Sequence, residues 1–358
     1  MIVGPRRRAL WLSLAVAVGV LAGCLTVLTV GPASAGSAPQ GPCDIYAAAG
    51  TPCVSADSTV RALYASYDGP LYQVTRASDG AKRVIRPQAA GGVAKASEQI
   101  SFCARTTCRI TEIYDQSPRH NDLTVEGTGV QGAADVGAPA DALPVTVDGS
   151  QVYGVKMSGG MGYRDNAATG TAENGQPESM YMVASGTYTN NSCCFDYGNT
   201  ERTNADTGNG HMDAVNLSTR CRFQPCYGPG PWVEADLENG LYRSSTGGSL
   251  SSSDTGPGAI PFATVMLANN GQDKFAIGWG NSRSGGLTTT YSGPEPTING
   301  GGYSPMHQEG GIVLGTGGDN SNKDVGEFFE GVMTSGVPAD AADNAVQANI
   351  VAAHYSGN

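Results

Sequence analysis

The chain has 358 residues, of which only 15% are charged, and it carries 51 glycines and a formal net charge of −11. Such a glycine-rich, polar and acidic composition is typical of an extracellular all-β protein. It argues against nucleic-acid binding, which needs a basic surface, while the length allows one large β-domain or two smaller ones.

The N-terminal segment has the pattern of a secretory signal peptide. Arg6 to Arg8 precede an apolar run over about residues 9–30, and Ala33-Ser34-Ala35 is a small-residue cleavage site. We therefore predict cleavage after this site, secretion, and a mature chain of residues 36–358 that is free of the membrane. The alternatives are a lipoprotein cleavage site at Cys24 and a membrane anchor formed by the same apolar run.

Eight cysteines lie outside this leader, and an even number predicts four disulfides in a secreted chain. Close spacing favours three local loops, Cys43–Cys53, Cys103–Cys108 and Cys221–Cys226. Cys193 and Cys194 remain. Neighbouring Cα atoms lie about 3.8 Å apart across a trans peptide, below the range of about 4.4–6.8 Å usual for a disulfide. From the residues alone, distant partners are therefore slightly favoured over a bridge between these two cysteines.

In chain order, residues 43–65 place apolar side chains at loosely helical spacing, which predicts one or two short helices. After them, short strands alternate with turns rich in Gly, Asn and Ser, as in a single-domain β-sandwich. Residues 244–257 form the longest polar connection, a candidate mobile rim, and residues 340–355 predict a C-terminal helix. The candidate strands are residues 71–74, 100–102, 109–115, 151–157, 179–186, 214–217, 261–267, 275–278, 287–291, 311–314 and 328–333.

The stretch Trp232-Val233-Glu234-Ala235-Asp236-Leu237-Glu238 alternates with period two and predicts a β-strand. Its apolar face should contact the core, and its aromatic and acidic face should contact water. Alternating carboxylates beside an aromatic ring could hold a sugar, with one carboxylate placed to attack it. The alternative is an ordinary solvated strand face.

Other motifs are weaker. Gly127-Thr128-Gly129-Val130-Gln131-Gly132 matches the dinucleotide-binding fingerprint by letters but lacks the required helix after it. The four histidines have no metal-ligand spacing, which argues against a zinc site. Asp319 follows the apolar run 311–314 on a tight glycine loop that could approach a ligand closely. The alternative for Asp319 is an Asp-Asn turn or a calcium loop.

Taken together, eight stretches carry a specific family resemblance that covers about residues 41–355. They are Gly41-Pro42-Cys43-Asp44-Ile45-Tyr46, Gly69-Pro70-Leu71-Tyr72-Gln73-Val74, Ile113-Tyr114-Asp115-Gln116-Ser117, Cys193-Cys194-Phe195-Asp196-Tyr197-Gly198-Asn199, Asp206-Thr207-Gly208-Asn209-Gly210-His211-Met212, Ala235-Asp236-Leu237-Glu238-Asn239-Gly240, Gly317-Gly318-Asp319-Asn320-Ser321-Asn322 and Glu330-Gly331-Val332-Met333-Thr334-Ser335-Gly336. The chain resembles the catalytic domain of glycoside hydrolase family 54, the α-L-arabinofuranosidase B type.

This resemblance implies a concanavalin-type β-sandwich, or jelly roll, with a few short helices and the C-terminal helix. It also implies a retaining mechanism without cofactor or metal, in which Glu238 is the nucleophile and Asp319 the acid/base. A vicinal disulfide between Cys193 and Cys194 would pack against the furanose ring, in place of the distant pairing above.

The resemblance further implies that the sugar hydroxyls bond to Asp236, Asn239 and the backbone at Gly318. Two departures stand out. The family's stacking Trp falls near Phe223 here, inside the Cys221–Cys226 loop, so Phe223 is the candidate contact. The fungal members also carry a C-terminal arabinose-binding β-trefoil, and we expect this chain to be a catalytic domain without it.

The expected activity is release of terminal α-L-arabinofuranosyl residues from plant cell-wall arabinan, arabinoxylan or their oligosaccharides, by a secreted monomer. Two alternatives remain. One is hydrolysis of another pentoside or furanoside, for example a β-xyloside. The other is a non-catalytic carbohydrate-binding sandwich, which would not need the second carboxylate at Asp319.

Overall fold

The computed structural model describes Met1, Gly4 and residues 40–223, 226–246 and 255–357. The predicted signal peptide and most of the predicted rim at residues 244–257 lie outside these residues. No helix in the described part is long and apolar enough to cross a membrane.

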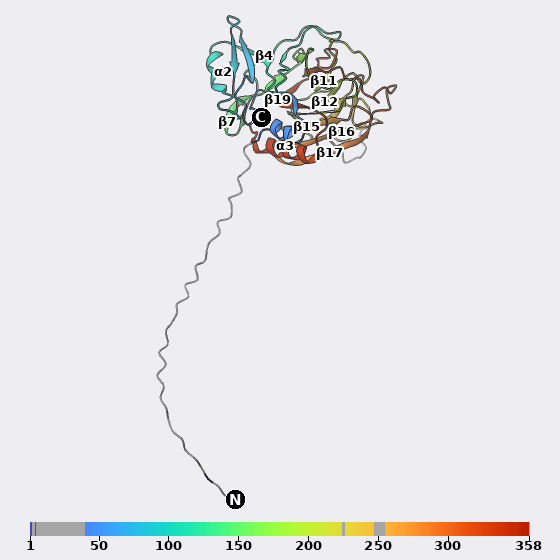
Figure 1. Ribbon diagram of the computed structural model, residues 1–358. Coiled ribbons are helices and arrows are strands. Elements are labelled where there is room, and N and C mark those ends of the chain that lie inside the picture. The colour runs from blue at the N-terminus through green and yellow to red at the C-terminus, as the bar shows by residue number, and fades with distance from the viewer. Residues whose placement is uncertain (2–3, 5–39, 224–225, 247–254, 358) are drawn as a thin grey trace, which may run out of the picture. The chain divides into compact units, whose positions relative to one another are not determined.

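Two large antiparallel sheets form most of the unit that starts at residue 39 (Figure 1). In spatial order the first sheet contains β1 (Cys53–Ser58), β19 (Gly326–Ser335), β10 (Glu178–Ala184), β15 (Ala263–Asn269), β16 (Lys274–Asn281) and β17 (Ser284–Pro294), with β8 (Val155–Met157) also paired to β19. The second contains β14 (Leu241–Tyr242), β13 (Trp232–Asp236), β12 (Asp213–Ser218), β11 (Asp196–Thr200), β18 (Gly311–Leu314), β9 (Tyr163–Asp165), β5 (Leu123–Val125), β4 (Cys108–Ile113), β2 (Tyr72–Arg76) and β3 (Lys82–Ile85). A separate hairpin joins β6 (Pro144–Val147) to β7 (Ser150–Tyr153).

The core lies between these sheets, where alternate residues of each strand point inward. Tyr197 of β11 meets Phe328 of β19 with 5.6 Å between ring centroids. The Tyr197 hydroxyl donates a 2.7 Å hydrogen bond to Asp57 of β1, so this polar tip has a partner inside the sandwich. The prediction of an all-β sandwich is confirmed.

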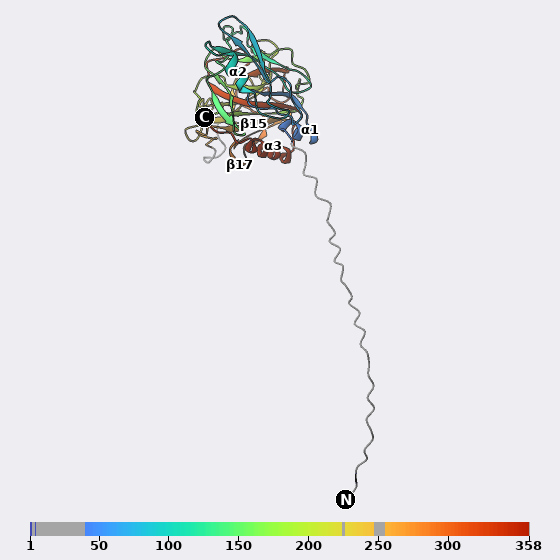
Figure 2. The same cartoon turned by 90° about the vertical axis from the view of Figure 1, so that its left-hand side faces the viewer.

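Three helices lie among the described residues, α1 (Pro42–Ala48), α2 (Ala96–Phe102) and α3 (Asp340–Ala352). α3 packs against α1 and β17, as both views of the ribbon show (Figures 1 and 2). Val346 and Ile350 are buried and Val351 is half-buried, so the predicted apolar face of the C-terminal helix is confirmed. The helix ends three residues before Tyr355, the last residue predicted for it.

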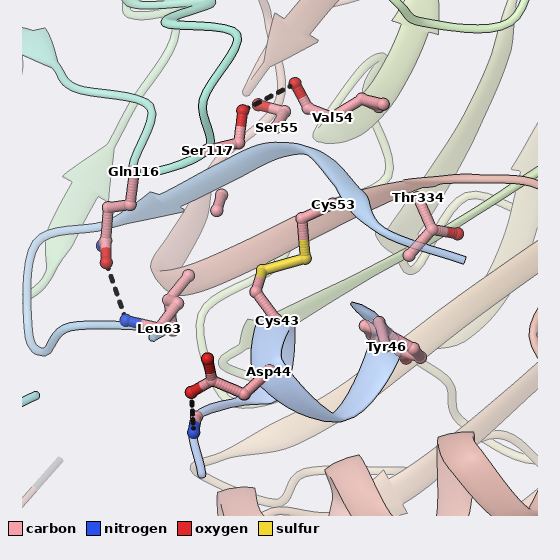
Figure 3. Close-up of a disulfide and its surroundings, with 12 residues drawn as sticks. Cys43, Asp44, Tyr46, Cys53, Val54, Ser55, Leu63, Gln116, Ser117 and Thr334 are labelled. Carbon is pink, nitrogen blue, oxygen red and sulfur yellow. Dashed lines mark hydrogen bonds between the residues drawn. A yellow bond between two sulfur atoms is a disulfide. The ribbon is translucent and has the colours of Figure 1, made fainter. Parts of the chain in front are cut away.

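The N-terminal region contains one of the one or two short helices predicted for it. Only residues 42–48 of the loosely helical stretch 43–65 are helical, and Cys53–Ser58 forms β1, a strand buried along its whole length. The Cys43–Cys53 disulfide joins α1 to β1 (Figure 3). Beside it, Leu63 N–H donates to Gln116 (2.7 Å) and Ser117 Oγ donates to the Val54 carbonyl (3.2 Å). The first bond fixes the segment after β1 and the second fixes β1 itself, and local apolar spacing does not reveal these long-range contacts.

Two other strand predictions need correction. Residues 100–102 are the end of α2 and not a strand. Residues 151–157 are split into β7 and β8 at Gly154. A side chain at position 154 would come within 2.9 Å of Leu143 and Phe329, so the backbone passes these residues too closely for anything but glycine.

Candidate active site

A pocket of about 220 Å³ opens over the second sheet, and it brings together most of the predicted site residues. Its lining comes from the segment before β11, the segment after β13 and the loop after β18. The lining residues are Gln131, Cys193, Cys194, Asp206, Arg220, Arg222, Asp236, Glu238, Asn239, Gly240, Leu241, Gly317, Gly318, Asp319 and Ser321. Of the predicted residues, only Phe223 is outside this lining.

The acidic strand β13 shows the predicted alternation but not the predicted exposure. Val233, Ala235 and Leu237 belong to the main hydrophobic core. The opposite face was expected to contact water, yet Glu234 is 1% and Asp236 is 6% exposed. The expectation of a solvated face is wrong, because the neighbouring loops cover this face and leave only the pocket open.

Glu238 follows β13 in a special backbone conformation. Its φ is +68° and that of Asn239 is +60°, both in the left-handed region that non-glycine residues rarely adopt. The Glu238 N–H donates a 3.2 Å bond to Asp236 Oδ1, and the Glu238 carbonyl accepts a 3.0 Å bond from the Tyr303 hydroxyl. These bonds hold the turn that aims the Glu238 side chain into the pocket, and strained backbone of this kind is common at functional sites.

The carboxylates around Glu238 cannot all be charged at once. Burial, followed by the charges of Asp236, Glu201, Asp206 and Asp319, raises the pKa of Glu238 to about 10. Oxygens of Glu201, Asp206 and Glu238 lie within 4.8 Å of one another. Like charges this close favour protonation of one member and couple their titrations.

Asp236 has its own buried partner, Asp196 of β11. Burial raises the pKa of Asp236 to about 7, while its hydrogen bond with Asp196 lowers that pKa. Asn216 Nδ2 donates a 2.6 Å bond to Asp196 Oδ1. Burial and the charge of Asp236 raise the pKa of Asp196 well above its ordinary value. Two buried carboxyls this close favour protonation of one of them and titrate as a pair.

Glu201, just after β11, is a site residue that sequence reasoning missed. It is fully buried, its Oε2 accepts a 2.9 Å bond from Thr200, and its Oε1 has no partner among the described residues. A Cβ at position 318 would collide with Glu201 Oε2 and come within 3.1 Å of Glu238 Oε2. Gly318 is thus the point where the loop after β18 passes directly over both carboxylates.

Asp319 lies next along this loop and lines the pocket. Its Oδ1 accepts bonds from the Ser321 hydroxyl (2.6 Å) and the Ser321 N–H (3.1 Å). Arg164, buried in β9, donates to the carbonyls of Gly318 (2.7 Å) and Glu201 (2.5 Å). Arg164 therefore holds the Asp319 loop against the segment after β11 that carries Glu201.

Cys193 and Cys194 are bonded to each other, across a cis peptide bond with Cα atoms 3.0 Å apart. The slight preference for distant partners is wrong, and the pairing implied by the resemblance is confirmed, as are the three local disulfides. Cys194 Sγ lies 3.4 Å from Asp236 Oδ2, so the bridge forms one wall beside the acidic face.

The bridge and Asp236 bring possible metal-ligand atoms together, but the bonded sulfurs offer no thiolate for a metal. The other such group in the described part of the chain is the carboxylate trio of Glu201, Asp206 and Glu238. Oxygen ligands would suit a hard cation, but an acidic cluster alone does not establish a metal site.

The remaining two predicted residues differ in position. Asn239 lines the pocket, and its Nδ2 donates a 3.4 Å bond to Asp206. The ring of Phe223 stacks on Tyr242, with centroids 5.1 Å apart and an interplanar angle of 18°. It therefore packs beside the pocket instead of facing it, and its neighbour Arg222 lines the rim.

All eight mature cysteines should be oxidised in the isolated protein. Intact mass before and after alkylation without reductant should show no free thiol, because every one of these cysteines is bonded in the structure. A peptide map should place Cys193 and Cys194 in one bridge. A link from either to Cys221 or Cys226 would contradict this wall of the pocket.

Comparison with known proteins identifies relatives along nearly the whole described chain. Residues 42–356 match a family model described as alpha-L-arabinofuranosidase B, catalytic. A probable alpha-L-arabinofuranosidase B of Aspergillus fumigatus is 52% identical over 322 residues, which cover 88% of this chain and 62% of the relative. The alpha-L-arabinofuranosidase of Hypocrea jecorina is 51% identical over 337 residues, 92% of this chain and 66% of that protein.

An arabinofuranosidase/B-xylosidase of Trichoderma koningii is 50% identical, and the match covers 92% of this chain and 66% of that protein. Among solved structures, an arabinofuranosidase complexed with arabinofuranosyl-alpha-1,2-xylobiose superposes with a TM-score of 0.85 at 49% identity, covering 89% of this chain and 66% of that one. The chain spans slightly less than two thirds of the length of these relatives.

Proposed function

The chain belongs to glycoside hydrolase family 54, the family of alpha-L-arabinofuranosidase B catalytic domains, and from this premise we propose that it is a secreted, retaining α-L-arabinofuranosidase. Its substrates would be terminal α-L-arabinofuranosyl residues on arabinan, arabinoxylan or their oligosaccharides. The observation that carries the proposal is that Glu238, Asp319 and the Cys193–Cys194 bridge line one pocket. The relative complexed with arabinofuranosyl-alpha-1,2-xylobiose supports a substrate of this class.

In this proposal the arabinofuranosyl ring packs on the Cys193–Cys194 bridge, a compact apolar wall. Asp236 and Asn239 bond its hydroxyls from one side, and the backbone at Gly318 does so from another. Asp236 suits the acceptor role because its Oδ1 already accepts a hydrogen bond from the Glu238 N–H. A ring held on three sides would present its anomeric carbon to Glu238.

The reaction then proceeds in two displacements. The Glu238 carboxylate attacks the anomeric carbon while protonated Asp319 gives its proton to the leaving oxygen. The C–O bond to the leaving group breaks, and a glycosyl ester to Glu238 forms. Asp319, now ionised, takes a proton from a water that attacks the same carbon, releasing arabinose and restoring both side chains.

Glu238 must be ionised to attack, although burial and its neighbours raise its pKa. Two features help. Protons on the neighbouring carboxyls remove the repulsion that disfavours the Glu238 anion. In the transition state, positive charge that develops at the anomeric carbon stabilises the same anion. Turnover therefore requires that Glu238 is ionised while carboxyls beside it hold protons.

Glu201→Gln should shift the acid limb of the pH profile of kcat/KM. The charge of Glu201 raises the pKa of Glu238, and a neutral amide of the same shape cannot. The acid limb should thus move to lower pH, by on the order of one pH unit for a like charge at this distance. Initial rates on 4-nitrophenyl α-L-arabinofuranoside from pH 3 to 11 measure the shift, because this range includes the raised pKa of Glu238.

Glu173→Gln is the matched control, because Glu173 pairs with Arg202 at the surface and is outside the pocket. Its pH profile should follow that of the wild type. An acid limb that stays in place or moves upward in Glu201→Gln would show that Glu201 does not act on Glu238 through its charge.

The proposal is tested by the configuration of the first product. Purified mature chain is incubated with 4-nitrophenyl α-L-arabinofuranoside and methanol, and proton NMR follows the anomeric signals. A retaining enzyme should first form methyl α-L-arabinofuranoside. Initial formation of the β-anomer would exclude the two-displacement mechanism, and no turnover on any pentoside would favour a sugar-binding protein without catalysis.

A second candidate is β-xyloside hydrolysis, which one relative's name, arabinofuranosidase/B-xylosidase, suggests. Rates on 4-nitrophenyl β-D-xylopyranoside, compared with those on the arabinofuranoside, decide between a single and a dual activity. Competition between the two substrates would show whether both use the pocket that contains Glu238.

A further inference from the structure

The glycine-rich segment 127–132, which matches a nucleotide-binding motif by letters, packs directly on the Asp319 loop. Gln131 N–H donates a 3.0 Å bond to the Asp319 carbonyl. The Asn320 side-chain amide donates to the carbonyls of Gly127 (2.9 Å) and Ala133 (3.0 Å). We call residues 127–132 the rim loop, which is distinct from the predicted mobile rim at residues 244–257.

The close packing explains two of the three glycines in the motif. A Cβ at position 129 would lie 2.5 Å from the Asp319 carbonyl oxygen, and a Cβ at position 132 would lie 2.6 Å from that of Asn320. Neither distance is one that a real side chain can adopt. Gly129 and Gly132 therefore serve backbone-to-backbone contact with the loop that carries the proposed proton donor.

This contact places the Gln131 side chain in the pocket wall, and the preceding residue, Val130, is exposed outside the pocket lining. Gln131 lines the pocket, and its side-chain amide has no hydrogen bond to any described residue. Val130 is 69% exposed, although its backbone N–H is fixed by a 3.0 Å bond to the Asn204 carbonyl. A fixed backbone thus holds the polar Gln131 side chain next to Asp319 and exposes the apolar Val130 side chain one residue before it.

The position of Asp319 says which part of a substrate meets these side chains. If Asp319 protonates the glycosidic oxygen, the leaving group begins at Asp319 and extends away from the arabinofuranosyl ring. Gln131 adjoins Asp319 on the pocket wall, on a different segment from Cys193–Cys194 and Asp236, which face the arabinofuranose. The first sugar of the leaving group therefore passes the rim loop.

We propose, on the basis of the function proposed above, that the rim loop forms the subsite for the sugar ring that carries the arabinofuranosyl group. The Gln131 amide donates to one ring hydroxyl and accepts from another, and Val130 packs against the C–H face of the same ring. The rim loop thereby selects substrates with a sugar as leaving group.

The test compares two substrates whose leaving groups both depart poorly without a proton, so that both depend on the acid. One is methyl α-L-arabinofuranoside, whose single carbon cannot reach Val130 or fill the subsite. The other is an arabinofuranosyl xylo-oligosaccharide. The wild type should prefer the oligosaccharide in kcat/KM. In Gln131→Ala this preference should fall by about tenfold. Each hydrogen bond contributes a factor of roughly 2–10 to kcat/KM, and this substitution removes two of them.

Val130→Ser should lower the preference in the same direction by a smaller factor, with most of the change in KM. Thr128→Ala is the matched control, because Thr128 is exposed on the same loop but neither lines the pocket nor adjoins Gln131 in the chain. Its preference should equal that of the wild type. Melting curves of all variants should match that of the wild type if the loop substitutions leave the fold intact.

Equal losses on both substrates in Gln131→Ala would overturn the proposal, because the rim loop would then only support Asp319. An unchanged preference in both Gln131→Ala and Val130→Ser would overturn it as well. A wild-type chain that hydrolyses neither substrate would instead refute the proposed function, and the subsite with it, so the two failures are distinguishable.

Discussion

Glu238→Gln should abolish turnover, with kcat reduced by at least about 10⁴-fold, as expected when a covalent nucleophile is removed. The amide keeps the shape of the side chain but cannot form the glycosyl ester. Initial rates on 4-nitrophenyl α-L-arabinofuranoside measure the loss. Near wild-type activity would show that another carboxylate attacks the sugar.

Smaller side chains at position 238 test directly whether Glu238 is the nucleophile. Glu238→Ala or Glu238→Gly leaves room for azide, which should restore part of the rate on the nitrophenyl substrate and form an arabinofuranosyl azide. Asp206→Ala is the control, since it opens space in the same pocket without removing the proposed nucleophile. Azide should not accelerate that variant.

Glu238→Gln should also be more stable than the wild type. The pKa of Glu238 is raised in the folded state, so its contribution to stability is fully present below the unfolded value near 4.3 and is lost as the pH rises toward about 10. The amide in Glu238→Gln has no charge to bury. Its melting temperature should exceed that of the wild type by a margin that grows from pH 4 to pH 8, a trade of stability for function.

Asp319→Ala should affect substrates according to their leaving groups. Arabinan and alkyl arabinofuranosides have poor leaving groups, so their hydrolysis should slow by roughly 10²–10⁴-fold, the usual contribution of a positioned acid. Nitrophenolate leaves without a proton, so that first step should be spared. Because Asp319 must then act as base, the second step should still slow, and stopped-flow absorbance should show a burst of nitrophenol.

The pH profile adds an independent readout. In Asp319→Ala the acid limb, which follows ionisation of Glu238, should remain in place. Equal losses on activated and unactivated substrates, with no burst, would mean that Asp319 only holds the sugar and that the acid is another carboxylate. A sugar-binding protein would show no turnover to lose.

The strand around Glu238 shows how far sequence reasoning reached. The alternation of Val233 and Ala235 with Glu234 and Asp236 was enough to predict β13 and its inward face. It could not predict burial of the acidic face, because that depends on loops distant in sequence. The pairing of Cys193 with Cys194 likewise could not be decided by spacing, and only the family resemblance pointed to it.

Glu201 was missed for a related reason. It follows β11 without any local motif, and it joins the site because β11 lies between β12 and β18 in the sheet. The only sequence signal was indirect. Gly318 must be a glycine because two carboxylates lie under it, but a glycine-rich loop does not say what it covers.

The contact between the rim loop and the Asp319 loop has a consequence for directed evolution. Because Gly129 and Gly132 touch the Asp319–Asn320 backbone, insertions or backbone changes in the rim loop would also displace the proposed proton donor. Libraries that aim at new leaving groups should therefore keep both glycines and the loop length, and randomise only positions 130 and 131. Replacement of these two side chains would then change the selectivity for the leaving group without moving the proposed proton donor.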